Sequence, residues 1–233
     1  MVVRKQGRRS AQDAENTKRE IMKVATELFC ELGYERVSLR NISEKAGVSH
    51  SLIRHHFGSK EQIWYAISDG LHKYMENYLH VIINNMPKNV EANVKLYLFS
   101  VQLLAHMLIV KQPIQLIADA VRQEDALFDY FIDNTGEIET LINRISEEYN
   151  SQNPGTPVKI WELKWQMIMF AHSAASLTPF MKETWRDETK DYNQCLLNHW
   201  GMFNHMMACR FSIPEDQQLK PSRVEDLVFE VSC

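Results

Sequence analysis

The chain has 233 residues, of which 45% are hydrophobic and 24% are charged, so it is long enough to bury more than one hydrophobic core. No apolar run reaches the roughly 18 residues of a membrane-spanning helix, and the basic N-terminus is not followed by the apolar segment of a secretory signal. We therefore expect a cytoplasmic protein without a membrane partner.

Charge is divided unevenly along the chain, although the formal net charge is only −4. Residues 1–60 hold 12 Lys and Arg against 7 Asp and Glu, a balance of +5, whereas the remainder of the chain has a balance of −9. Lys and Arg displace counterions from phosphates and so supply much of the affinity for nucleic acid. A basic N-terminal part on an acidic body is the distribution expected of a nucleic-acid-binding protein. Chance fluctuation of charge along the chain is the alternative.

The N-terminal segment is basic and has no acidic residue before Asp13. We expect residues 1–16 to form a flexible arm, which either lies along DNA or is a plain solvated tail. From about Asn16, apolar residues recur with the spacing of one buried helix face until Gly33 ends the pattern. This predicts a first helix that braces the segment after it.

Two short helices joined by a tight turn are predicted between Val37 and Lys60. Ser38 is placed to cap the first helix, because its hydroxyl can accept from the backbone amides at a helix start. Gly47 supplies the backbone freedom that a sharp corner needs, and Ser49 can cap the second helix. The pattern is that of a helix-turn-helix.

The second of these helices carries a polar face. Ile53 and Phe57 are four residues apart and can be buried together, which turns the intervening side chains outward or sideways. The side chains turned in this way are His50, Ser51, Leu52, Arg54 and His55. Residues of these types hydrogen-bond base edges and phosphates or touch a thymine methyl, so this helix is the candidate for recognition in the major groove.

Residues 17–64 resemble the N-terminal DNA-binding domain of the TetR family of bacterial transcription regulators. The resemblance rests, in order and without a gap, on Gly33-Tyr34, Ile42, Ala46-Gly47-Val48-Ser49 and His56-Phe57-Gly58-Ser59-Lys60-Glu61. One departure is Arg54, where the family usually has a Tyr that touches the DNA backbone. Because Arg reaches a phosphate and also binds guanine bidentately, the operator sequence cannot be borrowed from relatives.

The DNA-binding residues divide into two expected roles. We expect Ser38, His56 and Lys60 to hold phosphates. The residues expected to contact bases or the adjacent backbone are Arg40, His50, Ser51, Leu52, Arg54 and His55, with Ser49 at the start of the same helix.

Beyond the helix-turn-helix the apolar spacing stays helical and no strand pattern appears. Ser59 and Gln62 fit a capping box for a helix that runs from Lys60 to about Met86 and links two domains, either as a transmitter of motion or as a rigid spacer. Further helices are predicted at about 90–110, 113–124, 126–149, 158–177 and 192–210, with a loop at 151–157. Residues 214–233 look like a polar tail, of which at most a short end at Val228 and Phe229 is docked on the protein. We expect an all-α protein of about nine helices, with a three-helix DNA-binding domain at 17–62 and a ligand-binding and dimerisation domain at 63–213.

The last two long helices are rich in large apolar residues, which suggests a symmetric four-helix interface between two copies of the chain. The residues expected in this homodimer interface are Trp161, Trp165, Ala175, Leu196, Trp200 and Phe203. The resemblance to the TetR family implies the same location. Burial of these faces within one copy is the alternative.

The resemblance also implies a small-molecule pocket inside the C-terminal helices, whose occupation changes the affinity for DNA. The polar side chains that interrupt apolar stretches, and so could orient a ligand, are His106, Gln115, Asp119, Gln166 and His172. For each of them, a satisfied core or surface residue is the alternative. Nothing in the sequence names the effector.

The sequence predicts a regulator of transcription, more specifically a repressor whose homodimer binds a palindromic double-stranded operator and is released by a small-molecule effector. The alternative is a DNA-bound interaction protein whose C-terminal body binds a protein partner and no small ligand. Gly-rich phosphate loops, nucleophile elbows, HExxH and paired Cys motifs are missing from the sequence, so we expect no enzyme, no cofactor and no metal site.

Overall fold

The computed structural model describes residues 11–123, 127, 129–130 and 136–231. Within them the protein is all-helical, as predicted, with ten α-helices, two short 3₁₀ helices and no strand. The α-helices are α1 (Ala11–Leu32), α2 (Leu39–Ala46), α3 (His50–Phe57), α4 (Lys60–Asn85), α5 (Ala92–Ile109), α6 (Gln112–Gln123), α8 (Gly136–Gln152), α9 (Ile160–Ser176), α10 (Thr178–Thr184) and α11 (Tyr192–Arg210).

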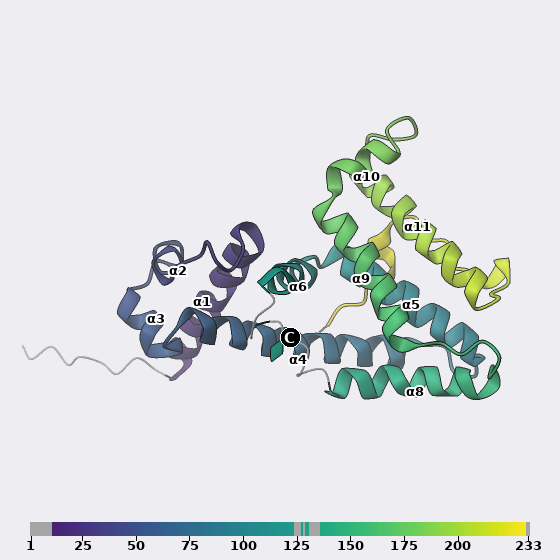
Figure 1. Ribbon diagram of the computed structural model, residues 1–233, viewed down its shortest axis with the longest axis horizontal. Coiled ribbons are helices and arrows are strands. Elements are labelled where there is room, and N and C mark those ends of the chain that lie inside the picture. Colours follow the sequence, from purple (N-terminus) through teal and green to yellow (C-terminus); the bar gives the residue numbers. More distant parts are fainter. Residues whose placement is uncertain (1–10, 124–126, 128, 131–135, 232–233) are drawn as a thin grey trace, which may run out of the picture.

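The helices form a head and a body (Figure 1). The head consists of α1, α2 and α3 at one end of the long helix α4. The body consists of α5 and α8, which pack on the other half of α4, and of α9, α10 and α11 beyond them. Helix α6 lies between the head and the body. The arrangement leaves α2 and α3 at the end of the molecule far from α11.

The caps of the head follow the sequence prediction. The Ser38 hydroxyl accepts the amide of Asn41 at 3.2 Å and the Ser49 hydroxyl accepts the amide of Leu52 at 3.2 Å, so both short helices begin at hydroxyl caps. Gly47 ends α2 with a φ of 64°, in the left-handed region where a glycine is least strained. Local chemistry therefore sets both ends of the turn.

Two hydrophobic cores form. The head core buries Ile21, Ile42 and Ile53 at 0% exposure, and it extends to Ile67 on α4. It also includes three residues from beyond α5, namely Leu116, Ala120 and Leu127. The division expected after residue 62 is therefore not a division between cores, because α4 and α6 both contribute to the head core.

Several helix bounds differ from the expectation. α1 begins at Ala11, so residues 11–16, which we expected in a flexible arm, are helical, while residues 1–10 lie outside the described residues. The helix expected at 126–149 is described as α8 from Gly136, and the segment before it lies largely outside the described residues. The short helix α10 was not predicted, because its seven residues show no helical repeat long enough to detect.

The segment expected as a polar tail is mostly packed on the body. Residues 212–231 form a C-terminal strap that contains the 3₁₀ helices η1 (Glu215–Gln217) and η2 (Val224–Leu227) and contacts α5 and α11. A hydrogen bond to a side chain of α5 also holds the strap, since the backbone amide of Leu219 donates to the Tyr97 hydroxyl at 2.8 Å. The docked segment is thus longer than the end expected at Val228 and Phe229.

Replacing Val224 by Ala should lower the free energy of unfolding by about 1–2 kcal/mol, because the side chain is only 1% exposed and anchors the strap in the body core. Chemical denaturation monitored by circular dichroism measures this change. Ser222→Ala, at an exposed position two residues earlier, is the matched control and should leave the midpoint unchanged. Equal midpoints for the two variants would show that the strap does not contribute to stability.

Among the described residues, α5 is the one helix whose length and composition would allow it to cross a membrane. Its mean hydropathy is 1.3, and 67% of this stretch is buried inside the protein. Packing against α4, α8, α9 and α11 accounts for the apolar composition of α5.

Candidate nucleic-acid interface and internal cavity

Helix α3 presents a polar face to solvent. Ile53, at 0% exposure, and Phe57, at 9%, anchor the helix in the head core. The fully exposed residues on the remaining face are His50, Ser51, Arg54 and His55, while Leu52 and His56 are half-buried beside them. This arrangement has the shape and chemistry of a helix that enters the major groove with its polar side chains toward base edges.

The two arginines of the helix-turn-helix differ in their pairing. Arg40 Nε lies 2.8 Å from Glu44 Oε1, one turn away on α2, so its charge is partly neutralised. Arg54 forms no ion pair within the described part of the chain. Arg54 is therefore the cation on this face that is most available to a guanine or a phosphate.

Lys60, one of the residues expected to bind a phosphate, is half-buried. Its Nζ donates to the backbone carbonyl of Tyr34 at 2.9 Å and lies 3.9 Å from the centroid of the Tyr34 ring. Lys60 thus joins the start of α4 to the loop after α1. Its contact with a phosphate stays a prediction. Ser38 and Ser49 are exposed at the starts of α2 and α3, where their hydroxyls serve as caps.

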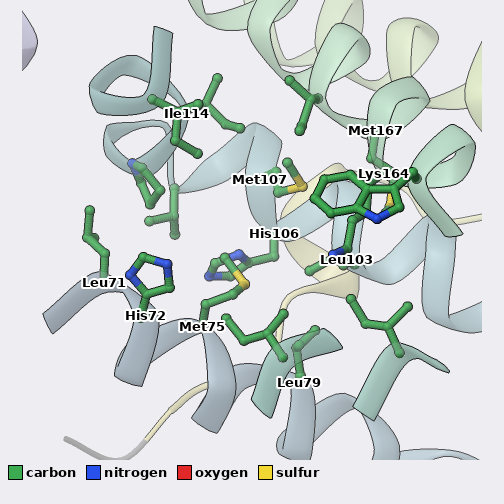
Figure 2. A pocket seen from close by; sticks show the side chains of 17 residues that line it. Leu71, His72, Met75, Leu79, Leu103, His106, Met107, Ile114, Lys164 and Met167 are labelled. Atoms are coloured by element: carbon green, nitrogen blue, oxygen red, sulfur yellow. The ribbon is translucent and has the colours of Figure 1, made fainter. Parts of the chain in front are cut away.

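A cavity of about 170 Å³, partly open to solvent, lies among α4, α5, α6, α8 and α9 (Figure 2). Its wall is almost entirely apolar, with three polar side chains, His72, His106 and Lys164. Figure 2 shows His72 and Met75 on the α4 side and Ile114 of α6 across the cavity from them. A concave apolar site with a few polar groups is typical of a small-molecule site.

His106 is the most constrained polar group of the cavity. The residue is 1% exposed, its ring stacks on Tyr78 with centroids 3.7 Å apart, and its Nε2 lies 2.8 Å from the Tyr74 hydroxyl. Its buried Nδ1 has no hydrogen-bond partner in the described residues. Burial lowers the pKa of His106 from 6.5 to about 4, so the ring is neutral near pH 7.

The comparison with known proteins begins with the head. The profile of a family described as bacterial regulatory proteins, tetR family, matches residues 21–67, which span α1 to the first turns of α4. The N-terminal domain belongs to the TetR family. We call residues 21–67 the TetR domain.

Curated relatives match the same segment. The HTH-type transcriptional repressor Rv3405c of Mycobacterium tuberculosis is 38% identical over 60 residues, which are 26% of this chain and 32% of that protein. The HTH-type transcriptional repressor AcnR of Corynebacterium glutamicum is 40% identical over 53 residues, which are 23% of this chain and 28% of that protein. The chain thus spans less than a third of the length of these relatives.

Solved structures extend the likeness beyond the TetR domain. HlyIIR, a hemolysin II transcriptional regulator, superposes with a TM-score of 0.53 at 18% identity, over 79% of this chain and 97% of that chain. The ketosteroid transcriptional regulator KstR2 of Mycobacterium tuberculosis superposes with a TM-score of 0.50 at 14% identity, over 88% of this chain and 96% of that chain. At these identities the likeness shows that the body has the fold of such regulators, and it shows the fold alone.

Four of the five residues expected to orient a ligand lie outside the cavity behind the TetR domain, and His106 alone lines it. Asp119 accepts the backbone amide of Tyr34, and Gln166 accepts from Arg210 at 3.3 Å, so both are engaged elsewhere. His172 Nδ1 lies 3.2 Å from the Ser176 hydroxyl on the same helix. Gln115 is half-buried on α6 and does not reach the lining.

The sequence prediction missed His72 and Lys164. His72 lies in the apolar stripe of α4, so a polar residue at a buried helical position was the available signal. Lys164 gives no such signal, because a lysine near a helix start is usually solvated. In the structure Lys164 Nζ lies 3.2 Å from Glu139 Oε1 and 4.3 Å from the centroid of the Trp161 ring.

The residues expected in a dimer interface fall into two groups. Leu196 and Trp200 are 2% exposed and Phe203 is 0% exposed, so they belong to the core of a single copy and cannot contact a second one. Trp161 and Trp165 are 57% and 61% exposed, and Ala175 is half-buried on the same helix. The expectation is therefore corrected for the three α11 residues, which fill the space between α11 and α5.

The free energy of unfolding should fall as the pH is lowered, because the buried His106 ring is neutral in the folded protein. Because its pKa is about 4 when folded and 6.5 ordinarily, the unfolded chain binds the proton first as the pH falls. The stabilisation that a neutral His106 provides is fully present above pH 6.5 and is lost as the pH falls toward 4, at up to about 1.4 kcal/mol per pH unit. Denaturant midpoints measured across this range should show a shallower pH slope for His106→Phe than for the original protein. An unchanged slope would contradict the burial of His106 as a neutral ring.

Proposed function

We propose that the protein is a homodimeric transcriptional repressor of the TetR type, which acts in the cytoplasm, binds a palindromic operator through α3 and is released when a small molecule occupies the internal cavity. The observation that carries the proposal is the exposed face of α3 within the TetR domain, where Arg54 and two histidines lie beside short hydroxyl side chains. We propose repression rather than activation because two curated relatives are named as transcriptional repressors. A dimer bound over a promoter blocks transcription without a further contact surface.

The proposed dimer interface is an exposed stripe on α9. Trp161, Trp165 and Met169 recur every four residues there and are 57%, 61% and 45% exposed. On the neighbouring helix α11, Met202 is 56% exposed. Large apolar side chains gathered on adjacent helices mark a surface that is covered by a partner, and a two-fold pairing of α9 and α11 would make a four-helix interface. Two heads related by such an axis require an operator made of inverted half-sites.

Helix α6 is the proposed connection between the cavity and the TetR domain. One face of α6 places Leu116 and Ala120 in the head core, and another face places Ile114 and Ile117 in the cavity wall. A ligand that displaces the cavity face of this helix therefore also displaces side chains packed against α1. This geometry supports an effector that acts on operator affinity through packing.

Polar contacts continue this connection at the end of α1. Asp119 Oδ2 of α6 accepts the amide of Tyr34 at 2.6 Å, and Lys60 of α4 donates to the Tyr34 carbonyl. Gly33 beside them has a φ of 82°, and a Cβ at this position would lie 2.9 Å from Asp119 Oδ1. The left-handed backbone at position 33 therefore favours glycine, and a larger side chain there would also displace the Asp119 carboxylate.

Replacing Asp119 by Ala should lower the free energy of unfolding by about 1–3 kcal/mol, because the substitution removes the acceptor that Asp119 offers to the Tyr34 amide. Urea denaturation measures the loss. Asp119→Asn retains an oxygen acceptor of the same size and should lose less than half as much. Equal stability of Asp119→Ala and the original protein would remove this contact from the proposed connection.

Selection from a random pool of DNA duplexes tests the proposed function. The purified full chain should enrich sequences with two inverted half-sites, because each copy contributes one α3. Enriched sequences with a single half-site would contradict the dimer, and the lack of any enriched sequence would contradict the proposed function itself.

A further inference from the structure

The size of the internal cavity limits what it can hold. At about 170 Å³ it is close to the cavity of about 150 Å³ that accommodates benzene in a protein core. Met75, Met107 and Met167 in its wall are flexible and allow modest growth. A molecule of one aromatic ring with short substituents matches this volume.

His106 determines which polar group a ligand of the cavity should carry. Its ring is fixed by the stack on Tyr78 and by the contact of Nε2 with Tyr74, while Nδ1 is buried without a hydrogen-bond partner in the described residues. A neutral imidazole donates through one nitrogen and accepts through the other, and the contact with Tyr74 fits either arrangement. A hydroxyl group both donates and accepts, so it satisfies Nδ1 in either tautomer.

The charge of the cavity favours a neutral molecule. Lys164 is the one lysine or arginine among the described residues of the wall, and its ammonium group is already paired with Glu139, with side chains 14% and 33% exposed. The pair is neutral as a whole, so a carboxylate ligand would place an additional uncompensated charge in an apolar space. Anionic molecules are disfavoured for this reason.

We propose that the cavity binds a neutral, one-ring or similarly small apolar molecule that carries a hydroxyl group, of the class of alkylphenols, and that the hydroxyl hydrogen-bonds Nδ1 of His106. This inference rests on the proposed function in that it names the chemical class of the effector. Shape and apolar contacts with the wall supply affinity for the ring, and His106 supplies the preference for the hydroxyl.

Three probes of nearly equal size test the inference on the full chain: 4-methylphenol, toluene and 4-methylbenzoate. Binding is followed by ligand-observed NMR and by the tryptophan fluorescence of the chain, to which Trp161 in the cavity wall contributes. 4-Methylphenol should bind about tenfold more tightly than toluene, and 4-methylbenzoate should bind most weakly. Equal binding of 4-methylphenol and toluene, preferred binding of 4-methylbenzoate, or no binding of any probe would overturn the inference.

Variants assign the preference to His106. His106→Phe retains an aromatic ring on Tyr78 and removes the nitrogen, so the two neutral probes should bind within about threefold of each other. His172→Phe, at a half-buried position outside the cavity wall, is the matched control and should keep the tenfold preference. A preference that survives in His106→Phe would overturn the role of His106, and the ranking of the three probes on the original protein decides the ligand class even if this variant fails to fold.

Duplex binding measured on the same preparation separates this inference from the proposed function. A chain that binds its selected duplex but ranks the probes differently contradicts the ligand class alone. A chain that ranks the probes as expected but binds no duplex contradicts the proposed function and leaves the cavity chemistry supported.

Discussion

Replacing Trp165 by Glu is expected to convert the proposed dimer into monomers and to lower operator affinity by about 100-fold or more. Trp165 is 61% exposed in the middle of the α9 stripe, and a two-fold interface repeats each substitution on both copies. Two carboxylates would therefore be buried without partners. The loss of affinity follows because a monomer holds a single half-site. Light scattering after size-exclusion chromatography gives the mass, and fluorescence anisotropy with a selected duplex gives the affinity.

The control for this experiment is an exposed aliphatic residue outside the proposed interface. Val121 on α6 is 45% exposed, so Val121→Glu adds the same charge at an exposed apolar position that is not part of the proposed interface. This variant should remain dimeric. If Trp165→Glu also remains dimeric, the α9 stripe is not the interface between copies.

Replacing Arg54 by Ala should reduce specific DNA binding by about 1–3 kcal/mol, the usual contribution of a good base contact. Arg54 is exposed on α3, and within the described part of the chain no carboxylate competes with DNA for its guanidinium. A competition titration with specific and unrelated duplexes measures the loss. Loss confined to the specific duplex indicates a base contact, whereas equal loss on all duplexes with a smaller salt dependence indicates a phosphate contact.

Arg186→Ala is the matched control for Arg54→Ala. Arg186 is an exposed arginine of the body that pairs with Glu183 at 2.6 Å, and it lies beyond α10, outside the TetR domain. Its replacement should leave duplex affinity unchanged. If Arg54→Ala behaves like Arg186→Ala, Arg54 is not part of the DNA contact surface.

The head was predictable from sequence because its structure is determined by short-range chemistry. Ser38, Gly47 and Ser49 act on amides and dihedral angles within three residues of themselves, so their roles can be deduced from spacing. The exposed polar face of α3 follows in the same way from the burial of Ile53 and Phe57. The caps and the burial pattern of α3 were confirmed for this reason.

The body could not be predicted to the same depth, because an apolar helical face gives no indication of what covers it. Trp165 and Trp200 belong to similar patterns, yet one is 61% exposed and the other is 2% exposed. In the same way, nothing in the sequence of α6 shows that Leu116 packs in the head while Ile114 lines the cavity. The cavity arises from the meeting of five helices, and only the three-dimensional packing shows that His106 lines it and Asp119 does not.

Equilibrium titration of a selected duplex against an unrelated duplex of the same length, at a salt concentration of about 0.15 M, tests the central claim that α3 recognises base pairs. The account predicts a preference for the selected duplex of about 1,000-fold or more, the lower range for specific DNA-binding proteins. Equal affinity for the two duplexes would contradict it.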